Sequence, residues 1–187
     1  MFSLTIDIAL PKKDLPSPKA MMEAAGRGVS NLVIGHLRER NMSRPRNRHG
    51  LPKSNYYADA ADSVTTEATE QSAVVTIRKE GLLLHWKGGD VRPRPGKRAL
   101  AIPMDPSVAG IWPSEAGGIA TGGDDEDGRY ALVWPKGSDH GWIKDVETGD
   151  LMWLLVPRVR IKADSSVLPS EKAISAAAKD AVMEMFA

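Results

Sequence analysis

The sequence predicts an α+β fold, in which an antiparallel sheet of about five or six strands is packed by an N-terminal and a C-terminal helix. Three observations favour this class. Residues 2–8 alternate between apolar and polar side chains, as in a half-buried strand. Residues 18–36 and 170–186 repeat apolar side chains at helical spacing. Between these helices lie short apolar or β-branched runs that Gly and Pro interrupt, which is typical of antiparallel strands.

Composition places the chain among globular proteins. Of its 187 residues, 42% are hydrophobic and 26% are charged, close to ordinary globular usage. The formal net charge of +1 gives no reason to expect a strongly charged partner for the whole chain. Cysteine is absent, which excludes disulfides and thiolate metal sites. We expect neither a signal peptide at residues 1–10 nor a membrane helix, since no apolar run approaches the ~20 residues a span needs.

The first helix is expected to begin at Ser17-Pro18, because serine is a good N-cap and proline suits the first helical position. Gly26, Gly28 and Gly35 each lower its intrinsic stability by roughly 1 kcal/mol relative to alanine. The helix must therefore depend on packing, or its glycines must admit a close neighbour. Its apolar face contains Met22, Ala25, Val29, Leu32, Val33 and His36.

A basic loop and a hairpin are expected next. Residues 38–53 contain six Arg or Lys against one Glu, and two prolines. Residues 55–64 are predicted to form a short helical or strand-leading segment. Residues 73–77 are rich in β-branched side chains and predict a strand. A turn at 78–81 is expected to join it to a second strand at 82–86, which forms a hairpin with the first.

Residues 82–103 join two apolar runs through a Gly-Gly turn and a basic arm. Pro93 and Pro95 exclude the arm from a central strand, so we expect it to be extended and to lie at an edge or on the surface. The apolar runs on both sides should anchor it. We expect Leu83, Trp86, Leu100 and Ile102 to be tightly packed, and Arg92, Arg94, Lys97 and Arg98 to project outward.

The remaining chain is predicted to complete a single structural domain over 1–187. Residues 106–149 are interpreted as an elaborated glycine-rich acidic insert, with a short strand at 130–134. Its three tryptophans argue against disorder. Residues 151–161 return to core character, with Pro157 marking an edge or bulge. The apolar stripe of the last helix contains Ile174, Ala177, Ala178, Ala181, Val182 and Met185.

Sequence motifs for catalysis or metal binding are weak. No glycine-rich phosphate motif is present. The acidic run fails as a calcium loop, because its first and twelfth positions would be Gly123 and Trp134. Ser138, Asp139 and His140 have the residue types of a triad, but adjacency in sequence is not triad geometry. We expect no enzyme activity, no metal and no cofactor.

The basic stretches 38–53 and 92–98 allow three interpretations. They could contact nucleic acid, since the first runs into Tyr56-Tyr57. They could also be a solvated surface, or meet the acidic run of a neighbouring subunit in a head-to-tail ring. The interface candidates are Arg38, Arg40, Arg44, Arg46, Arg48, Lys53, Arg92, Arg94, Lys97, Arg98, Asp124, Asp125, Glu126 and Asp127.

Three strings resemble the tail-completion and virion-morphogenesis proteins of Mu-like tailed bacteriophages and prophages. In that family a similar glycine turn, basic arm and A-L-A-I-P strand lie mid-chain, as in residues 82–103 here. The L-P-S-E-x-A-I string before the alanine-rich last helix is also similar. The insert at 106–149 departs from the family pattern. The third string comprises Arg44, Pro45, Arg46, Gly50, Pro52, Lys53, Asn55, Tyr56 and Tyr57.

The resemblance implies a structural function without a cofactor. Such a protein forms a ring, hexameric by the six-fold symmetry of tails, at the head-proximal end of the tail or at the head–tail junction. Its partners would be itself, the tail tube and the neck or connector proteins, with possible passing contact with DNA and none with a membrane. It would be located in the virion, and in the host cytoplasm during assembly. The alternative function is a small nucleic-acid-binding module that uses 38–53 and 92–98, and an enzyme at Asp139-His140 is a further alternative.

Overall fold

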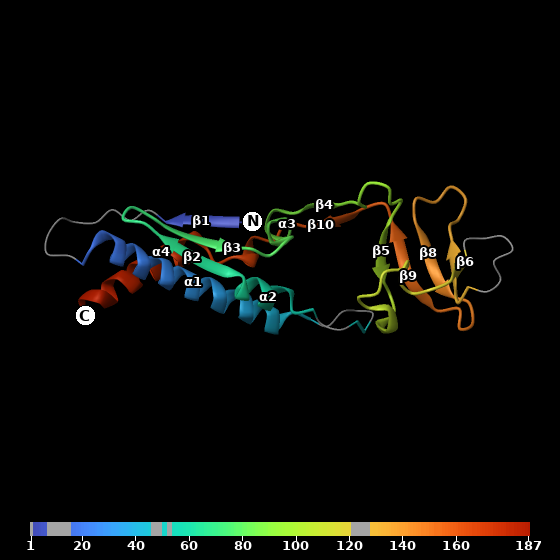
Figure 1. Cartoon of the computed structure of the whole chain (residues 1–187), viewed down its shortest axis with the longest axis horizontal. Coiled ribbons are helices and arrows are strands. Elements are labelled where there is room, and N and C mark those ends of the chain that lie inside the picture. Colours follow the sequence, from blue (N-terminus) through green and yellow to red (C-terminus); the bar gives the residue numbers. More distant parts are fainter. Residues whose placement is uncertain (1, 7–15, 46–49, 52–53, 121–127) are drawn as a thin grey trace. The chain divides into compact units, whose positions relative to one another are not determined.

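The computed structural model describes residues 2–6, 16–45, 50–51, 54–120 and 128–187, and the α+β class is confirmed (Figure 1). The chain forms two compact units, whereas a single domain with an insert was expected. Unit 1 comprises Met1–Arg44, Asn55–Gly89 and Lys162–Ala187. Unit 2 comprises Pro45–Ser54 and Asp90–Ile161. The expected insert belongs to unit 2, because its strand β8 pairs with β9, the strand that follows the insert, and its residues help to form a separate core.

Unit 1 contains a three-stranded antiparallel sheet with the order β1-β3-β2. The strands are β1 (Phe2–Ile6), β2 (Val64–Ala68) and β3 (Ala73–Ile77). Alternate residues of β3, namely Ala73, Val75 and Ile77, are buried, as the period of a strand requires. The predicted strands at the N-terminus and at 73–77 are confirmed, whereas β2 was not predicted.

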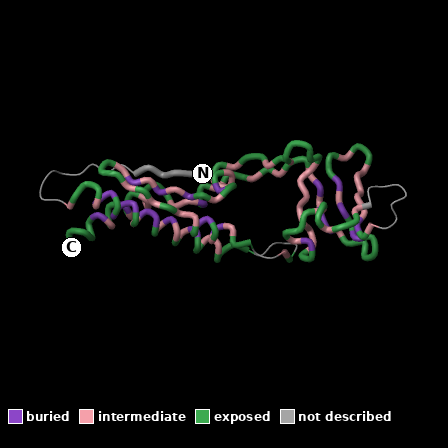
Figure 2. The backbone as a smooth tube through the Cα atoms, viewed as in Figure 1, coloured by how far each residue is buried: buried purple, intermediate pink, exposed green. Residues whose placement is uncertain are grey.

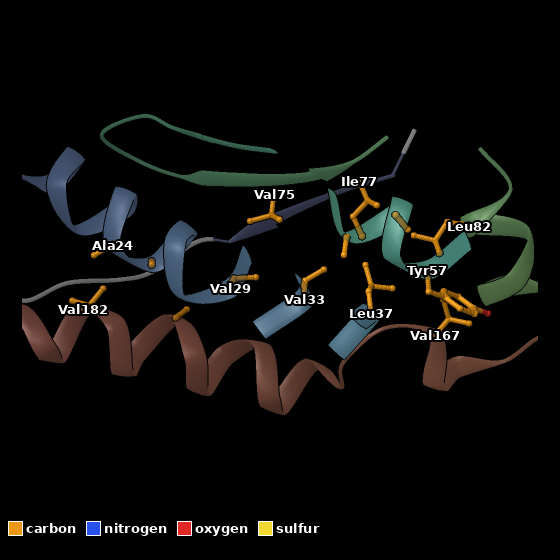
Figure 3. Close-up of a cluster of buried hydrophobic side chains, with 14 of the residues drawn as sticks. Ala24, Val29, Val33, Leu37, Tyr57, Val75, Ile77, Leu82, Val167 and Val182 are labelled. Atoms are coloured by element: carbon orange, nitrogen blue, oxygen red, sulfur yellow. The ribbon is translucent and has the colours of Figure 1, made fainter. Parts of the chain in front are cut away.

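Helices supply the rest of the unit 1 core (Figure 3). They are α1 (Pro18–Ser43), α2 (Tyr56–Asp62), α3 (Leu82–Lys87) and α4 (Glu171–Met183), with 3-10 turns at η2 (Ser165–Val167) and η3 (Glu184–Phe186). The α1 helix packs against both α4 and the sheet. Its predicted N-cap is confirmed, because the Ser17 hydroxyl accepts a hydrogen bond of 3.3 Å from the N–H of Ala20.

Two of the three α1 glycines lie at close contacts. A Cβ atom on Gly28 would be 2.5 Å from the carbonyl oxygen of Ala177 and 2.6 Å from the Cβ of Ala181, both on α4. A Cβ atom on Gly26 would be 2.6 Å from a methyl carbon of Thr66 on β2. The expected close neighbours are therefore confirmed at these two positions. A Cβ atom on Gly35 would have no atom within 4 Å outside its own stretch of helix.

The predicted strand at 82–86 is wrong, because these residues form α3. Gly81 and Gly88 flank the helix with φ angles of 81° and 74°, a left-handed backbone that ends an extended segment readily. The N–H of Gly88 donates to the carbonyl of Leu84 at 2.8 Å. In the helical geometry Leu82 is buried, while Leu83 is 44% exposed and is not the core residue that was expected.

Unit 2 is built on a five-stranded sheet with the order β5-β9-β8-β7-β6. The strands are β5 (Leu100–Pro103), β6 (Ile119–Ala120), β7 (Tyr130–Val133), β8 (Gly141–Asp145) and β9 (Leu151–Val156), and η1 (Pro106–Val108) is a 3-10 turn. All pairs are antiparallel except β6–β7. Buried residues concentrate along α1 in unit 1 and along β8 and β9 in unit 2 (Figure 2).

The chain also forms a two-stranded ribbon of β4 (Gly89–Val91) and β10 (Val159–Ile161). Pro157, which was expected to mark an edge or bulge, lies between β9 and β10, where the chain passes from one sheet to the other. Trp86, Leu100 and Ile102 are half-buried. The ribbon brings the segment after α3 beside the segment after β9, although the two are far apart in sequence (Figure 1).

Candidate interaction surfaces

The first basic stretch makes ion pairs within unit 1. The guanidinium of Arg38 lies 3.0 Å from a carboxylate oxygen of Asp62, and both side chains are more than 60% exposed. Such an exposed pair contributes little to stability. The guanidinium of Arg40 pairs with Asp164 and donates hydrogen bonds to the hydroxyl and the carbonyl of Ser166, at 2.9 and 3.1 Å. Arg40 therefore connects α1 to the segment before α4.

Asp164 is the acceptor at the centre of this connection. Its Oδ1 accepts hydrogen bonds from the hydroxyl and the backbone N–H of Ser166, at 2.6 and 3.0 Å. These bonds, together with the charge of Arg40, hold the pKa of Asp164 below its usual range. A carboxylate that is already ionised and paired makes Arg40 a structural residue rather than an open binding residue.

The tyrosine pair that follows the basic loop lies next to the same residues. Tyr57 is buried, and the guanidinium carbons of Arg40 and Arg44 lie 5.1 and 5.8 Å from the centre of its ring. Tyr56 packs edge-on against Tyr57, with 5.3 Å between the ring centres. These cation–π and edge-to-face contacts stabilise the fold. They also account for the aromatic residues that had suggested base stacking.

His85 joins this cluster from α3, which the sequence did not predict. Its ring centre lies 5.0 Å from that of Tyr56, and its carbonyl accepts a hydrogen bond from the N–H of Asp164 at 3.1 Å. Burial and the positive charges of Arg44 and Arg40 lower the pKa of His85. Burial, together with the charge of Tyr57, raises the pKa of Tyr56 to about 12. Both groups are thus uncharged at neutral pH, as suits a packed cluster.

The second basic stretch is exposed in unit 2, as predicted. Arg92, Arg94, Lys97 and Arg98 are all exposed. The stretch closes a turn and does not extend as an arm: the N–H of Lys97 donates to the carbonyl of Arg94 at 3.0 Å, and Gly96 has a φ of 81°. Pro followed by Gly at the two central positions is typical of a type II turn. The Pro95-Gly96 pair in the sequence therefore indicates this turn.

Two further arginines lie on the ribbon beside this stretch. Arg160 lies on β10 and Arg158 directly before it, and both are exposed. Arg158 lies 3.9 Å from the carboxylate of Asp90 on β4. Neither arginine was among the expected interface residues, because residues 151–161 were interpreted as a return to core character. The alternation of Arg158, Val159, Arg160 and Ile161 was the signal, since it predicts one polar and one apolar face.

Seven predicted interface residues lie outside the described residues. They belong to the basic loop between α1 and α2 and to the acidic run between β6 and β7. The pairing of basic and acidic loops between subunits therefore remains a prediction. The residues are Arg46, Arg48, Lys53, Asp124, Asp125, Glu126 and Asp127.

The Ser138-Asp139-His140 string does not have triad geometry. The Ser138 hydroxyl donates to the backbone carbonyl of His140 at 2.8 Å and is not directed at the imidazole. The Asp139 carboxylate contacts Nδ1 of His140 at 3.1 Å, with both side chains more than half exposed. A triad needs the imidazole between the two groups. In the described part of the chain, no group of three His, Asp or Glu side chains could hold a metal ion.

Comparisons with known proteins add nothing to these surfaces. No protein-family model matches the chain, and searches of curated proteins and of solved structures return no match. None of the helices described is long and apolar enough to cross a membrane.

Proposed function

We propose that the chain is a non-enzymatic virion protein of a tailed phage or prophage, which acts in tail completion or in the neck between head and tail. The proposal rests on the resemblance of residues 82–103 to proteins of that class. The geometry of this string supports a docking function. It presents an exposed basic turn between Trp86 and Leu100, which are both half-buried.

Backbone geometry explains why the string takes this form. The φ angles of Gly88, Gly89 and Gly96 are 74°, 152° and 81°. Residues that carry a side chain rarely adopt such angles. A Cβ atom on Gly89 would also be 2.6 Å from a methyl carbon of Leu84. Gly88 and Gly89 thus connect α3 to β4, and Gly96 allows the turn that exposes the basic side chains.

We propose further that the protein assembles as a ring of six copies, with the tail tube and the neck or connector proteins as its partners. Large exposed apolar residues are available for such contacts on each unit. Trp112 and Ile111 in unit 2 are 62% and 41% exposed, and Met183 and Phe186 in unit 1 are 65% and 47% exposed. Exposed apolar groups that a partner covers are typical of protein interfaces.

Deletion of the gene in its genome of origin tests the proposal. After induction, electron microscopy should show heads and tails that are not joined, or tails without a regular end. Supplying the intact chain should restore infectious particles, in which mass spectrometry should detect it. Normal infectious particles from the deletion strain would contradict the proposed function.

The ring has a separate test. Light scattering of the purified chain and an image reconstruction of the particle should give six copies in at least one of the two. A single copy in both would overturn the ring while leaving a function in assembly open to the deletion experiment. Isolated monomers alone are expected if the ring closes on the tube.

A further inference from the structure

Two basic segments that are distant in sequence lie at the paired strands β4 and β10: residues 92–98 follow β4, and residues 158–161 include β10. We call this surface the basic ribbon; it consists of residues 90–98 and 158–161. Its basic side chains are exposed on both of its chain segments. The basic residues are Arg92, Arg94, Lys97, Arg98, Arg158 and Arg160.

The basic ribbon has a strong charge imbalance. Asp90 is its one acidic residue, and it already faces Arg158 at 3.9 Å. Among the residues described, none forms an ion pair with Arg92, Arg94 or Lys97. This differs from the first basic stretch, where Arg38 and Arg40 face carboxylates. Positive charge that has no partner among the described residues attracts an anionic partner.

We propose that the basic ribbon binds the phosphate backbone of duplex DNA. Five of its six basic residues are arginine, whose planar guanidinium matches phosphate with two parallel hydrogen bonds. The proposal is independent of the proposed phage function and of the deletion experiment that tests it.

The turn at the end of the basic ribbon favours binding. Pro93 and Pro95 restrict the backbone, and the hydrogen bond from Lys97 to Arg94 closes the turn before any ligand arrives. A restricted backbone loses less entropy when it binds. The guanidinium of Arg98 is held 4.4 Å above the ring of Trp134, which also orders that side chain.

Binding of the full chain to a fluorescently labelled 30-base-pair duplex of mixed sequence tests this proposal. Anisotropy is measured at several salt concentrations for the wild type and for two variants with equal net charge. One variant replaces four ribbon residues: Arg92→Gln, Arg94→Gln, Lys97→Gln and Arg160→Gln. The matched control removes four exposed positive charges elsewhere: Lys136→Gln, Lys144→Gln, Lys172→Gln and Lys179→Gln.

The ribbon variant should lose more than tenfold in affinity at about 100 mM salt, and its plot of log K against log salt should flatten by roughly 0.9 for each lost phosphate contact. The control should stay within about threefold of the wild type. Both variants should melt like the wild type, because exposed charges contribute little to stability.

Three results would overturn the proposal. Equal loss in the two variants would show unspecific attraction by net charge. Absence of salt-dependent binding by the wild type would remove the ligand altogether. Polyglutamate that displaces the duplex at equal charge concentration would indicate an acidic protein as the partner.

Discussion

The hydrophobic cores of the two units are packed with different kinds of residue. In unit 1, small residues let helices and sheet approach closely: Gly28 contacts α4, and Ala24, Ala25, Ala60 and Ala61 are buried in the core of the unit. In unit 2, large side chains fill the core of the sheet. The rings of Tyr130 and Trp153 pack edge-to-face with 5.3 Å between their centres.

The difference predicts which kind of substitution should destabilise each unit most. A core of small residues has no room for an added methyl group, whereas a core of large residues loses most when a ring is removed. The predictions below test this contrast, beginning with the largest expected effect. Hydrogen exchange by mass spectrometry assigns each loss of stability to one unit.

Removal of the central ring of unit 2 should have the largest effect. Trp153 is 1% exposed, and its indole N–H donates to the carbonyl of Ile111 at 3.3 Å. Trp153→Ala should lower the free energy of unfolding by about 3–5 kcal/mol, as measured by urea denaturation. Faster exchange should be confined to unit 2. Trp112→Ala, at an exposed position, should change little; equal losses in both variants would contradict the assigned core.

Neighbouring leucines in α3 should differ sharply in unit 1. Leu82 is 2% exposed and Leu83 is 44% exposed. Leu82→Ala should cost about 2–5 kcal/mol by leaving a cavity, and Leu83→Ala less than about 1 kcal/mol. Thermal denaturation compares the two. The reverse order would restore the strand that the sequence predicted in place of the helix.

An added methyl group on α1 tests the close contact in unit 1. Gly28→Ala should destabilise unit 1 by about 1–3 kcal/mol, since α4 must move to admit the new atom. Gly35→Ala in the same helix should instead stabilise it by about 0.5–1 kcal/mol, because its surroundings are open. Chemical denaturation of the pair separates packing from helix propensity. Stabilisation by both substitutions would show that α1 and α4 are not in close contact.

Acid should weaken unit 2 through one buried carboxylate. Asp145 is 5% exposed and accepts hydrogen bonds from the backbone N–H groups of Thr148 and Glu147 and from Arg129, at 3.2, 2.9 and 3.2 Å. The bond from Thr148, with those from Arg129 and Glu147, lowers the pKa of Asp145. A lowered pKa in the folded state adds stability above the unfolded value of about 3.9, and this is lost as pH falls through the folded value.

The wild type should therefore exceed Asp145→Asn in urea midpoint by a constant amount between about pH 5 and 7, and the excess should shrink below about pH 4. Asp150→Asn, at an exposed position in the same turn, serves as the control and should show a small difference at every pH. A difference between wild type and Asp145→Asn that did not change with pH would exclude the carboxylate as its source.

Local signals in the sequence predicted where α1 begins but not where it ends, since α1 continues to Ser43 through residues that were expected to form a basic loop. The Ser17 hydroxyl accepts the expected N-cap hydrogen bond at 3.3 Å, and the Ser170 hydroxyl caps α4 in the same way at 3.2 Å. Such signals act within one turn of the chain and need no knowledge of the fold. The alternation at 73–77 likewise predicted β3 and its buried face.

Features that depend on distant pairing could not be predicted in the same way. The run at 82–87 is too short for periodicity to separate helix from strand, and its flanking glycines decided the outcome. The strand predicted at 130–134 was expected inside an insert, because nothing local shows that β8 follows it and pairs with β9. The basic ribbon was missed for the same reason, since β4 and β10 meet only in the folded chain.

The contact between α1 and α4 determines an order of events during synthesis. Every residue of unit 2 lies between these two helices in the sequence, and Gly28 receives its α4 neighbours, Ala177 and Ala181, only after unit 2 has been translated. Domains generally fold as units while the chain is being made. Unit 2 can therefore fold on the ribosome before α4 has been translated. Until then, the apolar surface of α1 that α4 covers is exposed, and we expect chaperones to bind the nascent chain there.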